Sequence, residues 1–305
     1  MSSAKKGNMG RGEWLLLLAA FIWGMAFVAQ SIGARYIGAF TFQCTRNFLG
    51  CLPLIPFILF RRKQLQPEVL LHRRSAVYRK ELILGSIATG AALTVAAVMQ
   101  QMGIGMTTVG KSGFITSLYI IFVPVLGIFI GRKTPGKIWL SIGLATIGFY
   151  LMNVVANMGK ETGGGPLIGT GEWLLLACAV WFAVQILVID HFVKTVDAVE
   201  LACGEFLVSG LLSLLPMLVL ERPSMGDLRA ALLPILYAGL MSSGVAYTLQ
   251  TVGQREARPE NASLLMSLES VFSLLGGILI LQQIPGPWEF AGCALVFTGV
   301  ILAQR

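Results

Sequence analysis

The sequence predicts an all-α integral membrane protein in which ten transmembrane helices form two inverted five-helix repeats. Composition is the first reason, since 55% of the 305 residues are hydrophobic and only 12% are charged. A soluble domain carries about a quarter charged residues, so this chain could not cover its surface in water. Internal repetition is the second reason, because the segment Gly12–Leu17 returns letter for letter as Gly171–Leu176. Each copy opens an apolar run that reaches a glutamine, Gln30 in the first and Gln185 in the second.

Ten apolar blocks justify the number of helices, since roughly 20 apolar residues cross the hydrocarbon core of a bilayer. The blocks must be helical because lipid offers no hydrogen-bond partner to an exposed backbone group. They cover residues 13–33, 38–60, 82–104, 108–130 and 137–156 in the first half, and 171–190, 197–220, 231–252, 259–281 and 287–304 in the second.

The domain boundaries follow from these blocks. We predict a first repeat at residues 1–156, a glycine-rich connector at 157–170 and a second repeat at 171–305. The first block is retained rather than cleaved as a signal peptide, because a cleaved segment has no reason to recur within the chain. Five spans are an odd number, so the second repeat enters the membrane upside down relative to the first.

Basic residues predict the orientation. With a cytoplasmic N-terminus, most of the 23 Lys and Arg residues lie in connections that face inward, above all in the segment 61–81. The positive-inside rule thus places both termini in the cytoplasm, and the same residues account for the net charge of +8 without a nucleic-acid partner. The arginines of this segment can also touch anionic lipid headgroups, but a topological role is enough to explain them. We expect a cell membrane, the inner membrane of a bacterium, as the location.

Four residues fall deep inside predicted spans and need an explanation. Arg46 and Glu205 each lie roughly 12 Å into a helix from opposite membrane faces, at 1.5 Å per residue. A second sequence echo aligns Tyr119 with Glu269, because both follow the dipeptide Ser-Leu, and both fall near the bilayer centre. A charge there costs at least about 2.5 kcal/mol even on lenient scales, so it must face a protein interior or water.

Motifs in both halves carry a family resemblance. They are Phe21–Gly24, Arg46–Leu49, Ser267–Phe272 and Ala291–Gly299. In their order and spacing over nearly the whole chain, the sequence resembles the EamA-type ten-helix carriers of the drug/metabolite transporter superfamily. The family usually has a proline after the glutamate of the ninth helix, where this chain has Ser270. The sequence therefore leaves open whether that helix is broken here, whereas Pro124 is present in the first repeat.

This resemblance implies a carrier that moves small organic solutes by alternating access through a cavity between the repeats. We expect a secondary transporter, and an exporter of amino acids or similar metabolites, because a site with both an arginine and carboxylates suits a zwitterion. Two alternatives stay open. One is an anion exchanger for phosphorylated or nucleotide-linked solutes, which would use Arg46 and Lys111. The other is a lipid translocator.

The carboxyl groups are the candidates for proton coupling. Glu269, near the midplane, can take up and release a proton because burial disfavours its charged form. The alternative is a permanently neutral glutamate that bonds a neighbouring helix, and Glu205 has the same two interpretations. Arg46 can grip a carboxylate or phosphate through its planar fork, or it can pair with a buried glutamate and hold helices together. Lys111 can simply extend its amine to the membrane surface.

Other polar and aromatic residues complete the predicted substrate site. With Arg46 and Glu269, it comprises Trp23, Gln43, Gln100, Tyr119 and Trp181. The amides offer hydrogen bonds and the rings offer flat walls for an organic molecule. Aromatic residues in membrane helices also serve as packing or interface anchors, which is the alternative for each ring.

Several chemistries find no support in the sequence. The five cysteines lie within predicted spans at no metal-binding spacing, and both histidines, His72 and His191, lie in predicted connections. No nucleotide-binding motif is present, so we expect neither an enzyme nor an ATP-driven pump, and neither a metal nor a cofactor. The expected partners are the small-molecule substrate and membrane lipid. The chain acts as a monomer or as a homodimer, for which Gly127 and Gly131 provide one small-residue contact motif.

Overall fold

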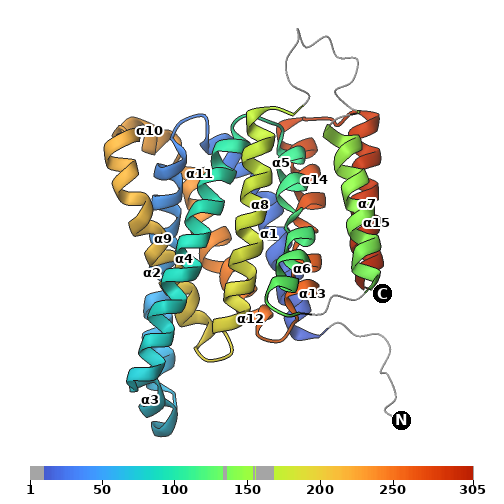
Figure 1. Cartoon of the computed structure of the whole chain (residues 1–305). Coiled ribbons are helices and arrows are strands. Elements are labelled where there is room, and N and C mark those ends of the chain that lie inside the picture. The colour runs from blue at the N-terminus through green and yellow to red at the C-terminus, as the bar shows by residue number, and fades with distance from the viewer. Residues whose placement is uncertain (1–9, 133–135, 154, 156–167, 305) are drawn as a thin grey trace, which may run out of the picture.

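The computed structural model describes residues 10–132, 136–153, 155 and 168–304, which form a bundle of helices (Figure 1). Within this part of the chain, eight helical segments are long and apolar enough to cross a membrane. They are Arg11–Gly33, Ala39–Lys63, Ala76–Ile104, Val109–Phe129, Thr170–Phe192, Ala198–Glu221, Leu232–Gln254 and Pro259–Leu281. An all-helical membrane protein is thereby confirmed, and these segments coincide with eight of the ten predicted spans.

The two remaining predicted spans coincide with α7 (Gly136–Asn153) and α15 (Pro287–Gln304), which are 18 residues long and pack against each other. The apolar stretch of α7 that the described residues establish is Trp139–Gly148. Most of the predicted connector at 157–170 lies outside the described residues.

The elements of the first half are α1 (Arg11–Gly33), α2 (Ala39–Lys63), α3 (Pro67–Arg74), α4 (Ala76–Ile104), α5 (Val109–Thr116), α6 (Tyr119–Phe129) and α7. Those of the second half are α8 (Thr170–Phe192), α9 (Ala198–Pro216), η2 (Met217–Glu221), α10 (Met225–Ala230), α11 (Leu232–Leu236), η3 (Tyr237–Tyr247), α12 (Thr248–Gln254), α13 (Pro259–Met266), α14 (Glu269–Leu281) and α15. Elements η2 and η3 are π-helical.

Helices of the two halves match in length and in contacts. Both α1 and α8 have 23 residues, and they begin at opposite ends of the bundle (Figure 1). Gly12 of α1 crosses Gly253 of α12 so closely that a Cβ on Gly12 would lie 3.0 Å from the Gly253 carbonyl oxygen. Gly171 of α8 crosses Gly103 of α4 in the same way, at 3.2 Å. Small residues at such crossings let helix backbones approach closely in a membrane.

Two spans are interrupted at equivalent places. Helix α5 gives way to α6 at Ser117 and Leu118, and α13 gives way to α14 at Ser267 and Leu268. At each break the chain tightens to three-residue hydrogen bonds, for example Ser270 N–H to the Ser267 carbonyl at 3.1 Å. The side chains of Ser117 and Ser267 bond carbonyls three residues earlier, which competes with the regular helical ladder. The span Pro259–Leu281 is therefore broken even though Ser270, and not a proline, follows Glu269.

The π-helical segment η3 accommodates one additional residue in the second half. Gly90 of α4 packs against the carbonyl of Glu205, and Gly239 of η3 packs against the carbonyl of Arg46. One residue more separates Gly239 from Gln250 than separates Gly90 from Gln100. A π-helix has more residues per turn than an α-helix, so the extra residue is absorbed without a shift of the flanking helices.

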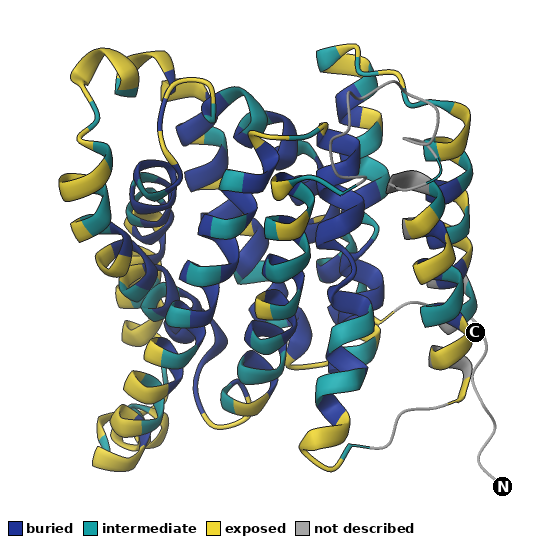
Figure 2. Ribbon diagram, turned by 45° about the horizontal axis from the view of Figure 1, so that its top comes forward, coloured by how far each residue is buried: buried dark blue, intermediate teal, exposed yellow. Residues whose placement is uncertain are grey.

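The bundle combines a centre that holds apolar and polar residues with an outer surface that is largely apolar. Buried residues, many of them polar, fill the centre, and exposed residues cover the outer faces (Figure 2). The outer faces carry large apolar side chains such as Phe129, Leu233 and Leu279, which are 82%, 77% and 78% exposed. An apolar surface of this extent requires lipid around it.

Candidate functional site

A narrow cavity with a free volume of about 30 Å³ lies in the centre of the bundle. The helices that form it come from both halves. Aligning the first residues of α1 and α8 pairs Trp23 with Phe182 and Phe27 with Ile186, and all four side chains line the cavity. The cavity therefore lies where matching faces of α1 and α8 look toward each other.

Three further matched pairs line the same cavity. Helices α5 and α13 both have eight residues, and their last residues, Thr116 and Met266, are one pair. The same alignment pairs Tyr119 with Glu269 just beyond the helix breaks, and Gln100 with Gln250 before α5 and α13. The helix breaks thus place the phenol of Tyr119, from the first half, and the carboxyl group of Glu269, from the second half, at the same cavity.

Arg46 provides the positive charge of the cavity. Its side chain is held by neutral groups: Nη2 donates to Ser242 Oγ at 2.8 Å, Nε donates to Ser243 Oγ at 3.1 Å and Nη1 donates to Gln30 Oε1 at 3.4 Å. The guanidinium carbon also lies 5.8 Å from the centre of the Tyr247 ring. Among the described residues, no carboxylate forms an ion pair with Arg46. Only 2% of the residue is exposed, so its charge is available to an anionic group inside the cavity.

Glu269 provides the carboxyl group of the cavity and is buried at the first position of α14. The hydroxyl of Tyr119, its matched residue, lies near this carboxyl. Three buried polar atoms of cavity residues have no hydrogen-bond partner among the described residues: Trp23 Nε1, Tyr119 Oη and Gln250 Oε1. Buried polar groups are normally satisfied, so these atoms are positions at which a molecule in the cavity can form hydrogen bonds.

Comparison with known proteins gives the family. The sequence matches the profile of the EamA-like transporter family over residues 10–154 and 169–304. This chain belongs to the EamA-like transporter family. The resemblance inferred from the sequence motifs is confirmed.

Relatives of this EamA-like chain are named as transporters. An uncharacterized transporter of Archaeoglobus fulgidus is 26% identical over 290 residues, which are 95% of this chain and 84% of the relative. The uncharacterized transporter YoaV of Bacillus subtilis is 22% identical and covers 94% of both chains. A WAT1-related chloroplastic protein of Arabidopsis thaliana is 23% identical over 96% of this chain and 69% of the relative. A solved crystal structure shares the fold with a TM-score of 0.71, covering 96% of each chain at 18% identity.

Glu205 lies behind the wall of the cavity in this EamA-like protein. It is fully buried, and its Oε1 accepts a hydrogen bond from Gln185 Nε2 at 2.7 Å. Gln185 in turn accepts one from Gln250 Nε2 at 3.3 Å, and both glutamines line the cavity. The second carboxyl oxygen of Glu205 makes no hydrogen bond to the described residues. One glutamine therefore separates this carboxyl group from the chamber.

The structure brings five of the seven predicted substrate-site residues together. Trp23, Arg46, Gln100, Tyr119 and Glu269 line the cavity. Gln43 instead donates to Ser209 Oγ at 3.0 Å and joins α2 to α9. Trp181 is 39% exposed on the outer side of α8, and its neighbour Phe182 faces the cavity.

Lys111 lies away from the central cavity, where it forms an ion pair with Glu289 at 3.4 Å. Sequence reasoning missed other cavity residues, namely Gln30, Gln185, Ser242, Tyr247 and Gln250. A signal for two of them was present, because the repeated apolar runs end at Gln30 and Gln185. No group of three His, Cys, Asp or Glu side chains that could hold a metal occurs within the described ranges.

Proposed function

We propose that this protein is a secondary transporter that exports amino acids or similar small organic metabolites by alternating access. The observation that carries the proposal is that a buried arginine and a buried glutamate line the same cavity without pairing with each other in the part of the chain that the structure describes. Arg46 has only neutral hydrogen-bond partners among the described residues, and Glu269 lies on the same chamber. A zwitterion would satisfy both, with its carboxylate on the guanidinium fork and its ammonium group on the glutamate.

The lining of the cavity supports a small organic substrate. Its free volume is about 30 Å³, below the roughly 300–1,000 Å³ typical of small-molecule sites, so the helices must move apart to admit a substrate. Trp23 and Tyr247 pack edge to face with ring centres 4.7 Å apart and form an aromatic corner of the cavity. The unsatisfied polar atoms of Trp23, Tyr119 and Gln250 supply additional hydrogen-bonding positions.

Alternating access also requires two halves that can rock against each other. We infer that α7 and α15 cross the membrane as well, and that the chain comprises two inverted five-helix repeats. The matched lengths of α1 and α8, the matched breaks before Tyr119 and Glu269, and the matched cavity pairs support this inference. Because α1 begins and α15 ends at the end of the bundle that carries the basic α3 (Figure 1), we assign that end to the cytoplasm.

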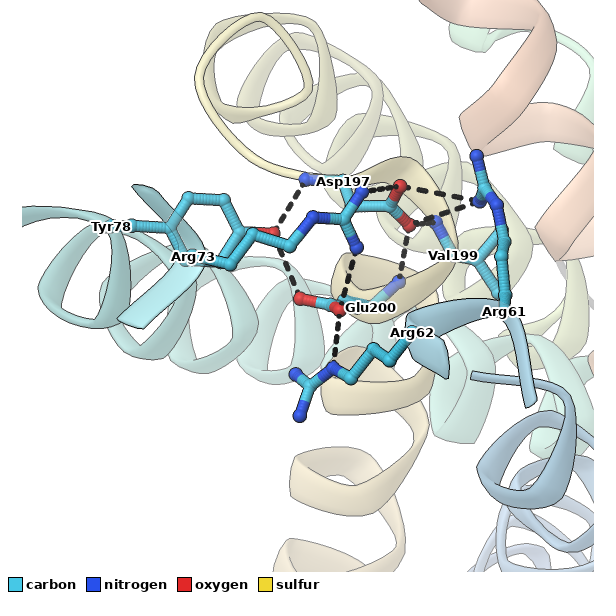
Figure 3. A network of polar contacts seen from close by, with 7 residues as sticks. All are labelled: Arg61, Arg62, Arg73, Tyr78, Asp197, Val199 and Glu200. Atoms are coloured by element: carbon cyan, nitrogen blue, oxygen red, sulfur yellow. Dashed lines mark hydrogen bonds and ion pairs between the residues drawn. The ribbon is translucent and has the colours of Figure 1, made fainter. Parts of the chain in front are cut away.

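A charged cluster joins the two halves at the end that we assign to the cytoplasm (Figure 3). We call this cluster the arginine clasp. In it, Arg61, Arg62, Arg73 and Tyr78 surround Asp197 and Glu200, which lie at the start of α9. Arg62 Nε lies 2.9 Å from Glu200 Oε1, and Arg73 Nη1 lies 2.8 Å from the same oxygen. Tyr78 donates to the other carboxyl oxygen of Glu200 at 2.8 Å.

The opposite end of the same helix pair is closed by matched positions. Aligning α2 with α9 pairs Arg62 with Glu221 and Thr41 with Glu200. Glu221 accepts hydrogen bonds from the Thr41 amide and hydroxyl, each at 2.6 Å, and from the Phe40 amide at 2.9 Å. Polar contacts therefore join α2 to the α9 span near both of its ends, where they can act as gates on opposite sides of the cavity.

Proton coupling is assigned to Glu269 first, because its carboxyl group faces the substrate chamber directly, whereas Glu205 acts behind Gln185. The test is efflux of labelled amino acids from loaded proteoliposomes with and without a pH gradient. A pH gradient should change the efflux rate of the wild-type protein, and Glu269→Gln should abolish that response. Glu205→Gln should slow efflux but keep part of the response, and Glu68→Gln, on the exposed α3, is the matched control.

The same experiment separates the alternatives. Strict dependence of efflux on a counter-substrate, with phosphorylated solutes as cargo, would replace the amino-acid exporter by an anion exchanger. Movement of headgroup-labelled lipid between leaflets would instead indicate a lipid translocator. An unaltered pH response in Glu269→Gln would end the assignment of proton coupling to this residue.

A further inference from the structure

A second, basic pocket lies outside the central cavity, at the end of the bundle that carries α3. The end of α2, helix α3 and the first turns of α4 line a free volume of about 420 Å³ there. Five of its eight lining residues are cationic, and none is acidic: Arg62, Lys63, Arg73, Arg74 and Arg79. Tyr78, Leu70 and Leu82 form the remaining lining.

The charge of this pocket is only partly neutralised. Arg62 and Arg73 bond Glu200 and Asp197 in the arginine clasp. Lys63, Arg74 and Arg79 form no ion pair within the described part of the chain, and all three are exposed. Three unpaired cations around one pocket attract an anionic group.

The position of the pocket matches the headgroup layer of a membrane. Helix α4 has 29 residues, which is roughly 43 Å at 1.5 Å per residue, whereas the hydrocarbon core is about 30 Å thick. The first turns of α4, with Tyr78 and Arg79, therefore extend past the hydrocarbon into the region of lipid headgroups. Arg74 and Arg79 also line a neighbouring hollow together with the exposed apolar side chains of Ile83, at 58%, and Leu84, at 46%. Acyl chains can lie against this surface while a headgroup enters the pocket.

We propose that this pocket binds the phosphate group of an anionic phospholipid. Lys63, Arg74 and Arg79 hold the headgroup, since Arg62 and Arg73 are engaged in the clasp. A phospholipid fits better than a soluble phosphate, because the pocket opens beside apolar side chains that a soluble ion would leave uncovered. The bound lipid would lie directly against the arginines that close the cytoplasmic end, and it stabilises the pocket walls by offsetting their mutual repulsion.

The test compares two variants with the same loss of charge. In K63Q/R74Q/R79Q the pocket loses its three unpaired cations. In R35Q/R222Q/R229Q three exposed arginines are removed outside the pocket, so nonspecific attraction to anionic lipid falls equally. Binding of fluorescent phosphatidylglycerol to the purified full chain is measured, with phosphatidylcholine as the zwitterionic reference.

Wild-type protein and R35Q/R222Q/R229Q should both prefer phosphatidylglycerol. The affinity of K63Q/R74Q/R79Q for phosphatidylglycerol should be roughly 100-fold lower than that of the wild-type protein, as expected for the loss of three basic residues near a phosphate. The single variant R79Q should weaken binding roughly fivefold, which keeps the test valid if the triple variant does not fold. Equal losses in the two triple variants would overturn the proposal, and so would full competition by inorganic phosphate, which would identify a site for a soluble anion.

Discussion

Arg46 of α2 and Glu205 of α9 occupy the same position in helices that begin at Ala39 and Ala198, yet no ion pair joins them in the described structure. Arg46 bonds Ser242 and Ser243 of the π-helical η3, whereas Glu205 bonds Gln185. Keeping the two charges apart has a functional consequence. A buried ion pair between them would neutralise the guanidinium, but serine partners orient it and leave its charge for a ligand.

The serines should therefore determine substrate affinity without contributing charge. In the double variant Ser242→Ala and Ser243→Ala, Arg46 loses two hydrogen bonds, each of about 1.5–3 kcal/mol for a charged donor. We expect the apparent KM for efflux to rise at least roughly tenfold. Thr248→Ala is the matched control, because the Thr248 hydroxyl bonds only the carbonyl of Gly244 in its own segment among the hydrogen bonds described. An unchanged KM in the double variant would show that the serines do not position Arg46.

The arginine clasp should stabilise the contact of α2, α3 and α4 with the start of α9. Glu200→Gln removes the charge that bonds Arg62 and Arg73, so the folded state should lose on the order of 2–3 kcal/mol. The expected result is a lower midpoint of thermal unfolding in detergent. Glu68→Gln changes the same group on an exposed surface and should leave the midpoint unchanged. A midpoint for Glu200→Gln equal to that of the control would contradict a stabilising clasp.

The sequence predicted the fold well because lipid leaves few alternatives to long apolar helices. Composition and the Gly12–Leu17 repeat predicted the spans, and the alignment of Tyr119 with Glu269 identified residues that prove to share one cavity. The sequence was less reliable in deciding which of two neighbouring residues faces the cavity. Trp181 and Phe182 are equally plausible cavity residues until it is known which face of α8 packs inward. Spacing within helices α2 and α9 did not reveal that Gln43 faces Ser209.

Other features depend on backbone geometry that no motif encodes. Ser242 and Ser243, which both accept hydrogen bonds from Arg46, lie in the π-helical η3, and no sequence motif marks this segment as π-helical. The break before Glu269 forms without the proline that usually marks it, because local serine hydroxyls bond the backbone instead.

The close approach of α1 to α14 should be sensitive to a single methyl group. A Cβ on Gly24 would lie 2.2 Å from the Phe272 Cβ and 2.9 Å from the Glu269 carbonyl oxygen. Gly24→Ala must therefore push α14 and its carboxyl group aside, at a cost of about 1–3 kcal/mol or more. Gly143→Ala is the control, since nothing lies within 4 Å of a Cβ there, and it should be neutral or stabilise α7 by up to about 1 kcal/mol. Thermal unfolding measures both, and equal midpoints would argue against tight packing at Gly24.

Weakening the contacts at either end of the α2–α9 pair should open the cavity, and the two ends should open it to opposite sides of the membrane. Glu200→Gln weakens the end at α3, and Glu221→Gln weakens the end where Thr41 and Phe40 donate to the carboxylate. A single cysteine in place of Gln250, in a cysteine-free background, reports access to the cavity. A membrane-impermeant thiol reagent should label it faster from the cytoplasmic side in Glu200→Gln and faster from the other side in Glu221→Gln. Because the matched positions lie at opposite ends of antiparallel helices, faster labelling from the same side in both variants would contradict the assignment of these contacts as alternating gates.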